Sequence, residues 1–419
     1  MNRRILVASS SALACALALA ACSGGSSDSS SGPVELTVWT GFTGGDRPGY
    51  DQIVKDFNAS HPNIKVTMDV QPWDTIQQKL PSAWVTGQGP DIAAPSSDPN
   101  VIAQYVKTGS VLPLTATGTR DGQIDTAAFP KTLNDVFTYD GKLYAVPANY
   151  ATLSLYYNKK AFADAGISAP PKTVEEFKAD AVKLTKDGQY GLALADNNTI
   201  QMWPLLQWLE GGDIVDSNNC SVLQTPEGQN SLKTWTDLVV KDKIAPVGLT
   251  GAEADSLFSA GKAAMEMNGP WAASGFKDAG IDLGIATIPL AQDGDAVTLG
   301  STAPLAVSAK TKHPKEAQEF VAYWTSKDVQ RTFSKTTGFP PLRTDLADDS
   351  ELAADPTISV FASQVPDARL YLPHVPNATQ VDAEQYVPMI GKITRGADVA
   401  SETTSTGAAI DGLTGCTSK

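Results

Sequence analysis

Histidine and cysteine are scarce in this sequence, with 3 His and 4 Cys among 419 residues. The histidines, His61, His313 and His374, are far apart and lack carboxylate or cysteine neighbours at metal-ligand spacing. No zinc signature, nucleophile-elbow serine motif or phosphate-binding P-loop is present. These absences argue against the corresponding enzyme classes, and we expect no metal, no cofactor and no catalytic residue.

Basic residues are outnumbered, with 32 Lys and Arg against 46 Asp and Glu. The first 21 residues carry two of the basic residues and no acidic one, which leaves the rest with 30 against 46, a net charge of −16. An acidic surface is repelled by nucleic acid and by anionic membranes, and it favours solubility. We therefore expect neither of these as a partner.

Long hydrophobic runs are confined to the N-terminus, where Ile5 to Ala20 is apolar and follows Arg3 and Arg4. This run is too short and too rich in alanine to favour a permanent membrane span. A basic start, an apolar run and small residues are typical of a secretory signal, which we assign to residues 1–21. The protein is therefore expected to leave the cytoplasm.

Residues 19–22, Leu-Ala-Ala-Cys, resemble a bacterial lipobox, in which Cys22 becomes the lipidated first residue of the mature protein. The alternative is an ordinary signal cleaved nearby, with Cys22 unmodified. Residues 22–33 are rich in Gly and Ser and form a tether without a core. We expect the protein at the extracellular face of the cell membrane, attached to it only through Cys22.

Two cysteines remain outside the signal and the lipobox, Cys220 and Cys416. Cysteines left over in an exported protein are more often paired than free. The sequence therefore predicts a disulfide between them.

The mature chain begins with an α/β pattern. Residues 34–39 and 64–70 alternate apolar and polar side chains as strands do, whereas 50–60 and 74–86 have helical spacing. Strands alternating with helices predict a parallel sheet. Residues 91–94 form a further buried strand, and the loop after it lies where open α/β sheets bind ligands. The length of the chain exceeds one usual core, which favours two lobes.

Helix starts are clear at two positions in the second half of this pattern. Thr173 with Glu176, and Thr250 with Glu253, have the spacing of a capping box. The second helix is followed by an apolar strand that stops at Asn-Gly-Pro and ends on Trp271. A strand that ends at such a turn places its next side chain at an edge, although a core position for this tryptophan is the alternative.

Aromatic residues indicate a class of ligand. Sugars offer a C–H face and a rim of hydroxyls, so their sites combine flat aromatic rings with polar side chains. Four aromatic residues lie at strand ends or in loops: Trp39, Tyr150, Trp203 and Trp271. Trp235 and Trp324 lie within helical spacing and are assigned to the core.

The sequence resembles the extracellular solute-binding proteins of bacterial carbohydrate ABC transporters, the family that includes maltose-binding protein. The resemblance covers the mature chain in these segments: LTVWTG (36–41), GPDI (89–92), YDGKLYAVP (139–147), LSLYYNKKAFADAGI (153–167), TVEEF (173–177), MWPLL (202–206), MEMNGPW (265–271), HPKEAQEFVAYW (313–324) and GFPPLR (338–343). Each segment is degenerate alone, but their common order and spacing are specific.

The resemblance implies two α/β lobes joined by a hinge that the chain crosses more than once and that closes on ligand. Residues 34–149 with 303–345 are assigned to the first lobe, and 150–302 with 346–419 to the second. Crossings are expected near 149–152 and 299–303. The resemblance also implies a monomeric receptor that binds a carbohydrate and delivers it to ABC transporter permease subunits.

By the same resemblance, Trp271 is a stacking platform, Trp203 begins the opposing helix, and Asp98 matches a carboxylate that binds sugar hydroxyls. The expected ligand contacts are Trp39, Thr40, Thr43, Asp98, Tyr150, Trp203, Trp271, Gly300 and Arg343. The sequence departs from maltose-binding protein at three positions, with Thr43 in place of an aspartate, Pro95 in place of a tryptophan and Ala151 in place of a glutamate. The resemblance therefore implies membership of the family, but it does not imply that maltose is the ligand.

Two alternatives to a carbohydrate receptor stay open at this point. A secreted glycoside hydrolase also needs aromatic and carboxylate residues around a sugar. The same receptor fold could instead bind a solute that is not a sugar, such as a polyamine or a peptide.

Overall fold

The computed structural model describes residues 32–115, 123–186, 188–197 and 202–417. The predicted signal, the lipobox with Cys22 and nearly all of the tether lie outside this part. The elements from the N-terminus to the first crossing are β1 (Val34–Thr40), α1 (Arg47–Ser60), β2 (Ile64–Val70), α2 (Trp73–Thr86), β3 (Ile92–Ala93), η1 (Pro99–Val101), α3 (Ile102–Lys107), η2 (Thr126–Ala128), α4 (Lys131–Val136), β4 (Thr138–Tyr139), β5 (Lys142–Leu143) and β6 (Val146–Pro147).

The middle of the chain adds β7 (Ala151–Thr152), β8 (Ser154–Asn158), α5 (Lys159–Asp164), α6 (Val174–Leu184), β9 (Tyr190–Ala193), α7 (Met202–Leu209), α8 (Pro226–Val240), α9 (Gly251–Ser259), β10 (Ala263–Asn268), η3 (Pro270–Ala272), α10 (Ala273–Asp278), β11 (Leu283–Ala286) and β12 (Thr298–Ser301). The remainder consists of β13 (Pro304–Val307), α11 (Pro314–Trp324), α12 (Lys327–Thr337), η4 (Thr344–Leu346), α13 (Ser350–Ala354), α14 (Pro356–Ser363), η5 (Val365–Asp367), β14 (Ala368–Leu370), α15 (Ala378–Gln380), the π-helix η6 (Val381–Tyr386), α16 (Val387–Ile393) and α17 (Val399–Thr414).

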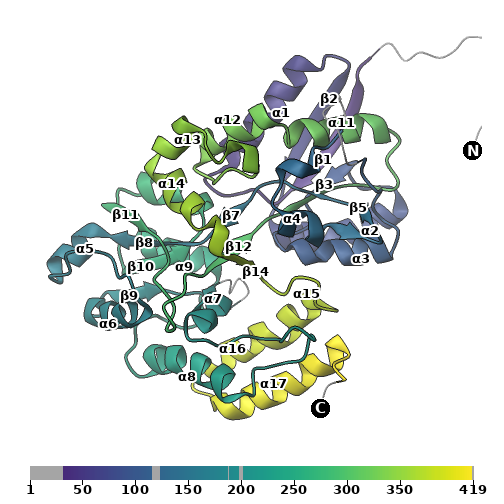
Figure 1. Cartoon of the computed structure of the whole chain (residues 1–419). Helices are drawn as coiled ribbons and strands as arrows, with labels where there is room; N and C mark the ends of the chain where they lie inside the picture. Colours follow the sequence, from purple (N-terminus) through teal and green to yellow (C-terminus); the bar gives the residue numbers. More distant parts are fainter. Residues whose placement is uncertain (1–31, 116–122, 187, 198–201, 418–419) are drawn as a thin grey trace, which may run out of the picture.

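The buried apolar residues fall into two large clusters. One takes its members from Leu36 to Ala151 and from Ala303 to Leu342, and the other from Leu153 to Leu299 and from Phe361 to Ile410. We call the surroundings of the first cluster lobe 1 and those of the second lobe 2; Figure 1 shows them as the upper and lower halves of the molecule. Tyr150 and Ala151 pack with lobe 1, although the sequence placed the start of lobe 2 at residue 150.

Each lobe is built on a mixed sheet. In lobe 1 the order is β2-β1-β3-β13-β6, and in lobe 2 it is β11-β8-β10-β9. The predicted parallel arrangement is confirmed for β1, β2 and β3, but β13 runs antiparallel to β3. The reason is that β13 enters lobe 1 directly from the other lobe, without a crossover helix to reverse its direction.

Helix starts follow the capping chemistry expected from the sequence. Thr250 and Glu253 form a complete capping box at the start of α9. At the start of α6 the Thr173 side chain accepts the N–H of Glu176, as predicted, but the Glu176 carboxylate accepts the N–H of Lys172. The Glu176 carboxylate therefore binds the backbone N–H of the residue before Thr173, and not the N–H of Thr173 itself.

A disulfide joins Cys220 to Cys416, the pair expected from the sequence, with Cα atoms 5.0 Å apart. It fixes the end of α17 to the segment that precedes α8, in lobe 2. No helix in the described part of the chain combines the length and hydrophobicity needed to cross a membrane.

Candidate functional site

The chain passes between the lobes through a small central sheet of three strands, β14-β12-β7 (Figure 1). Asn149 ties the crossing segments together, because its Oδ1 accepts the N–H of Ala303 at 3.1 Å and its carbonyl accepts the hydroxyl of Thr302 at 2.6 Å. Its Nδ2 donates to the hydroxyl of Tyr50 on α1, 2.6 Å away. Asn149 was not singled out in the sequence, where an asparagine in a loop gives no signal of its own.

Tyr150 and Gly300 lie next to each other at this crossing. A Cβ on Gly300 would lie 3.3 Å from the Tyr150 hydroxyl oxygen, so the glycine leaves room for the phenol. Tyr150 is buried, and its burial raises its pKa to about 12. The phenol is therefore a neutral hydrogen-bonding group at physiological pH.

Trp271 stands at the boundary between the lobes. It is half-buried and packs against both apolar clusters, with its ring centroid 6.4 Å from that of Phe339 in lobe 1. The turn before it is held in place because the Tyr156 hydroxyl donates to the Gly269 carbonyl at 2.7 Å. A Cβ on Gly269 would come within 2.2 Å of the Trp271 ring, so glycine is needed for the ring to lie flat against the turn.

The loop after β1 approaches Trp271 from lobe 1. A Cβ on Gly44 would lie 3.7 Å from the Trp271 carbonyl oxygen, and a Cβ on Gly45 would lie 2.2 Å from the Ser274 hydroxyl oxygen. Thr43 is exposed in the same loop, and Thr40 at its start is buried with no hydrogen-bond partner for its hydroxyl among the described residues. Burying a hydroxyl without a hydrogen-bond partner costs free energy. A hydrogen bond between the Thr40 hydroxyl and an additional polar group would therefore be stabilising.

Asp98 lies at a second contact between the lobes. Its Oδ1 accepts hydrogen bonds from the backbone and side chain of Asn100, each at 2.9 Å, and its Oδ2 accepts the Thr379 hydroxyl from lobe 2 at 3.4 Å. Burial raises the pKa of Asp98, against the lowering effect of these hydrogen bonds. Asp98 is thus in contact with lobe 2 through Thr379.

Trp203 does not lie at this boundary. It is fully buried in the core of lobe 2, and its indole N–H donates to the Ala195 carbonyl at 3.0 Å. A ring enclosed on all sides offers no face to a ligand, so its assignment as a ligand contact is corrected to a structural role. The signal for this was the Met202–Leu209 segment itself, in which every residue except Gln207 is apolar.

A test of this correction is the substitution Trp203→Phe. We expect it to lower the free energy of unfolding by about 1–2 kcal/mol, because it removes a buried hydrogen bond and leaves a gap. Chemical denaturation measures the loss, and solute affinity should stay within about twofold of the wild type. A large loss of affinity with unchanged stability would return Trp203 to the site.

Arg343 is also engaged elsewhere. Its guanidinium pairs with Asp125 at 2.7 Å and with Asp345 at 2.9 Å, and it donates to the Thr325 carbonyl at 3.1 Å, all within lobe 1. A buried cation with these partners is structural, and its donors are not available to a ligand. Trp39 is half-buried against the core of lobe 1.

A pair of acids, the fully buried Glu266 and the half-buried Asp255, lies behind the Trp271 turn. Asn268 Nδ2 donates to Asp255 Oδ1 at 2.7 Å and to Glu266 Oε1 at 3.0 Å. Burial, followed by the nearby charge of Asp255, raises the pKa of Glu266 well above its usual value. Glu266 is fully buried in β10 and cannot reach a sugar, and its hydrogen bond with Asn268 helps to fix the turn.

The pair predicts a pH-dependent effect of Glu266→Gln. Because the folded pKa is raised above the unfolded one, the contribution of Glu266 to stability is present at low pH and is lost as pH rises. An amide stays neutral, so the stability of the variant relative to the wild type should rise from pH 5 to pH 8. Urea unfolding at both pH values checks this, and an equal difference at the two would contradict it.

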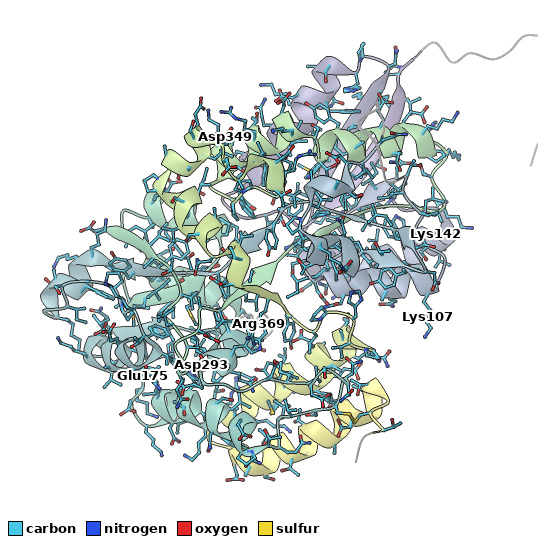
Figure 2. All side chains as sticks on the ribbon, in the orientation of Figure 1. Lys107, Lys142, Glu175, Asp293, Asp349 and Arg369 are labelled. Atoms are coloured by element: carbon cyan, nitrogen blue, oxygen red, sulfur yellow. A yellow bond between two sulfur atoms is a disulfide. The ribbon has the colours of Figure 1, made fainter. Side chains whose placement is uncertain are left out.

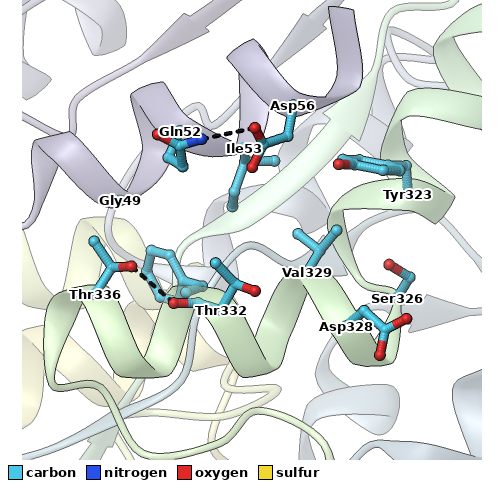
Figure 3. Close-up of a pocket in the computed structure, with 11 residues that line it drawn as sticks. Gly49, Gln52, Ile53, Asp56, Tyr323, Ser326, Asp328, Val329, Thr332 and Thr336 are labelled. Atoms are coloured by element: carbon cyan, nitrogen blue, oxygen red, sulfur yellow. Dashed lines mark hydrogen bonds between the residues drawn. The ribbon is translucent and has the colours of Figure 1, made fainter. Parts of the chain in front are cut away.

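A cavity of about 240 Å³ between α1 and α12 belongs entirely to lobe 1 (Figure 3). Gly49, Ile53 and Phe333 are among its lining residues, and none of the predicted ligand contacts is. No group of three or more His, Cys, Asp and Glu side chains suited to a metal occurs within the described ranges.

A model of the bacterial extracellular solute-binding proteins matches residues 52–360. The chain belongs to this family. Proteins similar to it include a binding protein of Brucella abortus, 27% identical over 85% of this chain and 87% of the relative, and the maltotriose-binding protein of Pyrococcus abyssi, 25% identical over 81% and 73%. The solved GacH receptor of Streptomyces glaucescens, studied unliganded and with acarbose, superposes with a TM-score of 0.81 at 25% identity, over 92% of this chain and 99% of that one. These likenesses confirm the two-lobe α/β receptor fold of the family.

Proposed function

We propose that the protein is the lipid-anchored, extracellular substrate-binding component of an ABC importer and that it binds a mono- or oligosaccharide between its lobes. The observation that carries the proposal is Trp271, an indole that is only half-buried although it touches both cores. An aromatic ring at a boundary that opens and closes can stack on a sugar face. Thr43, Asp98, Tyr150 and Gly300 supply the polar surroundings, and delivery to a permease follows from the family.

The relatives that bind maltotriose and acarbose support a carbohydrate as the solute. The lipobox and the Gly/Ser tether support an anchor through Cys22. The two apolar clusters support lobes of residues 34–149 with 303–345 and of residues 150–302 with 346–419, except that Tyr150 and Ala151 belong to the first. No described observation favours a glycoside hydrolase over binding, because the clearest carboxyl pair, Glu266 with Asp255, lies beneath the turn and not at a ligand surface.

A screen by thermal unfolding tests the proposal. A solute that binds only the folded protein raises its apparent stability, by about 2.7 kcal/mol at a concentration 100 times the dissociation constant. We expect at least one sugar from a panel of mono- and oligosaccharides, maltotriose included, to raise the unfolding temperature. A response to polyamines or peptides but to no sugar would replace carbohydrate by another solute class.

A further inference from the structure

The eight tryptophans of the chain fall into two groups. Five are buried, and each donates its indole N–H to a protein oxygen at 2.8 to 3.1 Å: Trp84 to Pro90, Trp203 to Ala195, Trp208 to Asp213, Trp235 to Leu206 and Trp324 to Ala148. Arg369, labelled near the middle of Figure 2, also lies over the Trp208 ring with its Cζ 5.9 Å from the ring centroid. These five indoles are therefore structural.

The other three, Trp39, Trp73 and Trp271, are half-buried. Their indole N–H groups have no hydrogen-bond partner within the described ranges, and their nitrogens are not among the buried atoms there that lack one. Solvent therefore reaches these three donors. Trp39 and Trp271 were expected as ligand contacts from the sequence, whereas Trp73 was not, although it also follows the end of a strand.

Trp73 is the first residue of α2, and its ring is held by the end of the neighbouring strand β1. The ladder between β1 and β2 ends where the Gln71 N–H donates to the Thr40 carbonyl at 2.9 Å, and Pro72 then begins α2. A Cβ on Gly41 would lie 2.0 to 2.4 Å from three atoms of the Trp73 ring. The indole therefore lies flat against the Gly41 backbone, in space that only a glycine leaves free.

Phe42 holds the same indole from the side. Its ring meets Trp73 edge-on, with centroids 5.5 Å apart and planes at 86°, and it stacks on Tyr50 at 3.8 Å. Tyr50 and Phe42 belong to the core of lobe 1. The position of Trp73 is thus fixed by packing that needs no solute.

The loop after β1 connects Trp73 to the lobe boundary. Gly41, under the Trp73 ring, begins this loop, and Gly44 and Gly45 further along it approach the Trp271 backbone and the following helix in lobe 2. The two half-buried indoles therefore lie at opposite ends of one short loop, and they belong to different lobes.

The loop after β3 gives a second, independent connection. Gln77 lies one helical turn after Trp73, on the same face of α2, and its Nε2 donates to the Ser96 hydroxyl at 3.1 Å. The Ser96 hydroxyl also accepts the N–H of Asp98 at 3.0 Å, and Asp98 contacts Thr379 of lobe 2. This face of α2 is thus turned toward the boundary, at the carboxyl ends of the parallel strands β1, β2 and β3, where open α/β sheets bind ligands.

We infer that Trp73 is a ligand-binding residue of lobe 1, which stacks on a sugar ring and donates its N–H to a sugar hydroxyl. The inference rests on the proposed function, because it assigns Trp73 to the same site. Gly41 covers one face of the indole, which leaves the opposite face and the N–H edge for the solute. Each lobe then contributes one indole to the site, Trp73 from lobe 1 and Trp271 from lobe 2.

The physical reason is the match between an indole and a sugar. The flat ring packs against the C–H face of the sugar, and the N–H pairs with a hydroxyl at its rim. Because Gly41 and Phe42 already hold the ring, binding costs little side-chain entropy. Truncation of Trp73 should therefore lower affinity, and a smaller flat ring should restore most of it.

The first test is a calorimetric titration with maltotriose, or with the best sugar of the screen. Trp73→Ala should bind about tenfold more weakly than the wild type, and Trp73→Phe, which keeps a ring but loses the donor, about threefold more weakly. Val85→Ala is the matched control, because Val85 is an exposed apolar residue at the other end of α2, and it should keep the wild-type affinity.

Gly41→Ala provides a second variant that leaves Trp73 in the chain. Its methyl group would occupy the place of the indole, so the ring has to move and affinity should fall about tenfold. Combined with Trp73→Ala, the same change should cause no further loss, because both act on one contact. Losses that add would overturn the inference.

Fluorine NMR of the wild type containing fluorotryptophan observes the contact without a substitution. The Trp73 signal is the one that is missing in Trp73→Phe. We expect it to move when the sugar is added, together with the Trp271 signal, whereas the signal of Trp84, enclosed in the core of lobe 1, should stay. A stationary Trp73 signal would overturn the inference.

The outcomes separate this inference from the proposed function. If no sugar of the panel binds the wild type, the proposed function fails and the inference fails with it. If a sugar binds and Trp271→Ala weakens it while Trp73→Ala does not, the inference alone is overturned. A purely structural role would lower the stability of Trp73→Ala without changing its affinity, so unfolding curves of each variant are recorded alongside.

Discussion

Trp271→Ala should weaken binding of the sugar found by the screen about 100-fold, equivalent to about 3 kcal/mol. Trp271 is half-buried between two apolar clusters, and its removal would take away an indole face at the lobe boundary. Aromatic residues at the centre of a binding surface commonly contribute this much when they are truncated. Isothermal titration of the wild type and the variant measures the change.

Tyr323→Ala is the control for Trp271→Ala. Tyr323 is also a partly buried aromatic residue, but it lines the cavity between α1 and α12 in lobe 1. Affinity in this variant should stay within about twofold of the wild type. Unchanged affinity in Trp271→Ala, or an equal loss in both variants, would remove Trp271 from the binding site.

Removal of the disulfide by Cys220→Ser with Cys416→Ser should lower the free energy of unfolding by about 3 kcal/mol. The cross-link closes a separation of 196 residues and restricts the unfolded chain accordingly. In the folded protein the same region is held by Ser221, whose N–H donates to Asp411 Oδ1 at 2.7 Å, so α17 remains docked without the bond. The variant should therefore fold but unfold at lower urea.

The wild type treated with reductant supplies the comparison for the double variant. Reduction should lower its stability to that of the variant, whereas the variant itself should not respond to reductant. Equal unfolding curves for the oxidised wild type and the variant would show that the cross-link contributes nothing to stability.

The sequence predicted the elements whose signals are local. The strand that ends at Thr40, the helix that begins after Thr250 and the strand that runs into the Trp271 turn all lie where periodicity and capping placed them. These features depend on neighbouring residues only, which is why one sequence is enough to find them. The match of the family model and the superposition on related receptors confirm the fold class.

The contents of the site were harder to predict, because they depend on which residues meet across the boundary. Trp203 and Arg343 have side chains that can bind a sugar. In the folded protein, however, Trp203 is buried in the core of lobe 2, and Arg343 forms ion pairs with Asp125 and Asp345. Asn149 carries no motif, and its partners Tyr50, Thr302 and Ala303 are distant in sequence. Contacts of this kind become visible only when the lobes are placed together.

The central claim is that the protein holds a carbohydrate between its lobes and releases it unaltered. Equilibrium dialysis of the purified protein with maltotriose and the other sugars of the panel, followed by mass spectrometry of the sugar recovered from the protein, tests this claim most directly. The account predicts about one sugar per protein, recovered with its mass unchanged, and about 100-fold weaker retention by Trp271→Ala. Recovery of shorter sugars, or no retention of any sugar, would contradict it.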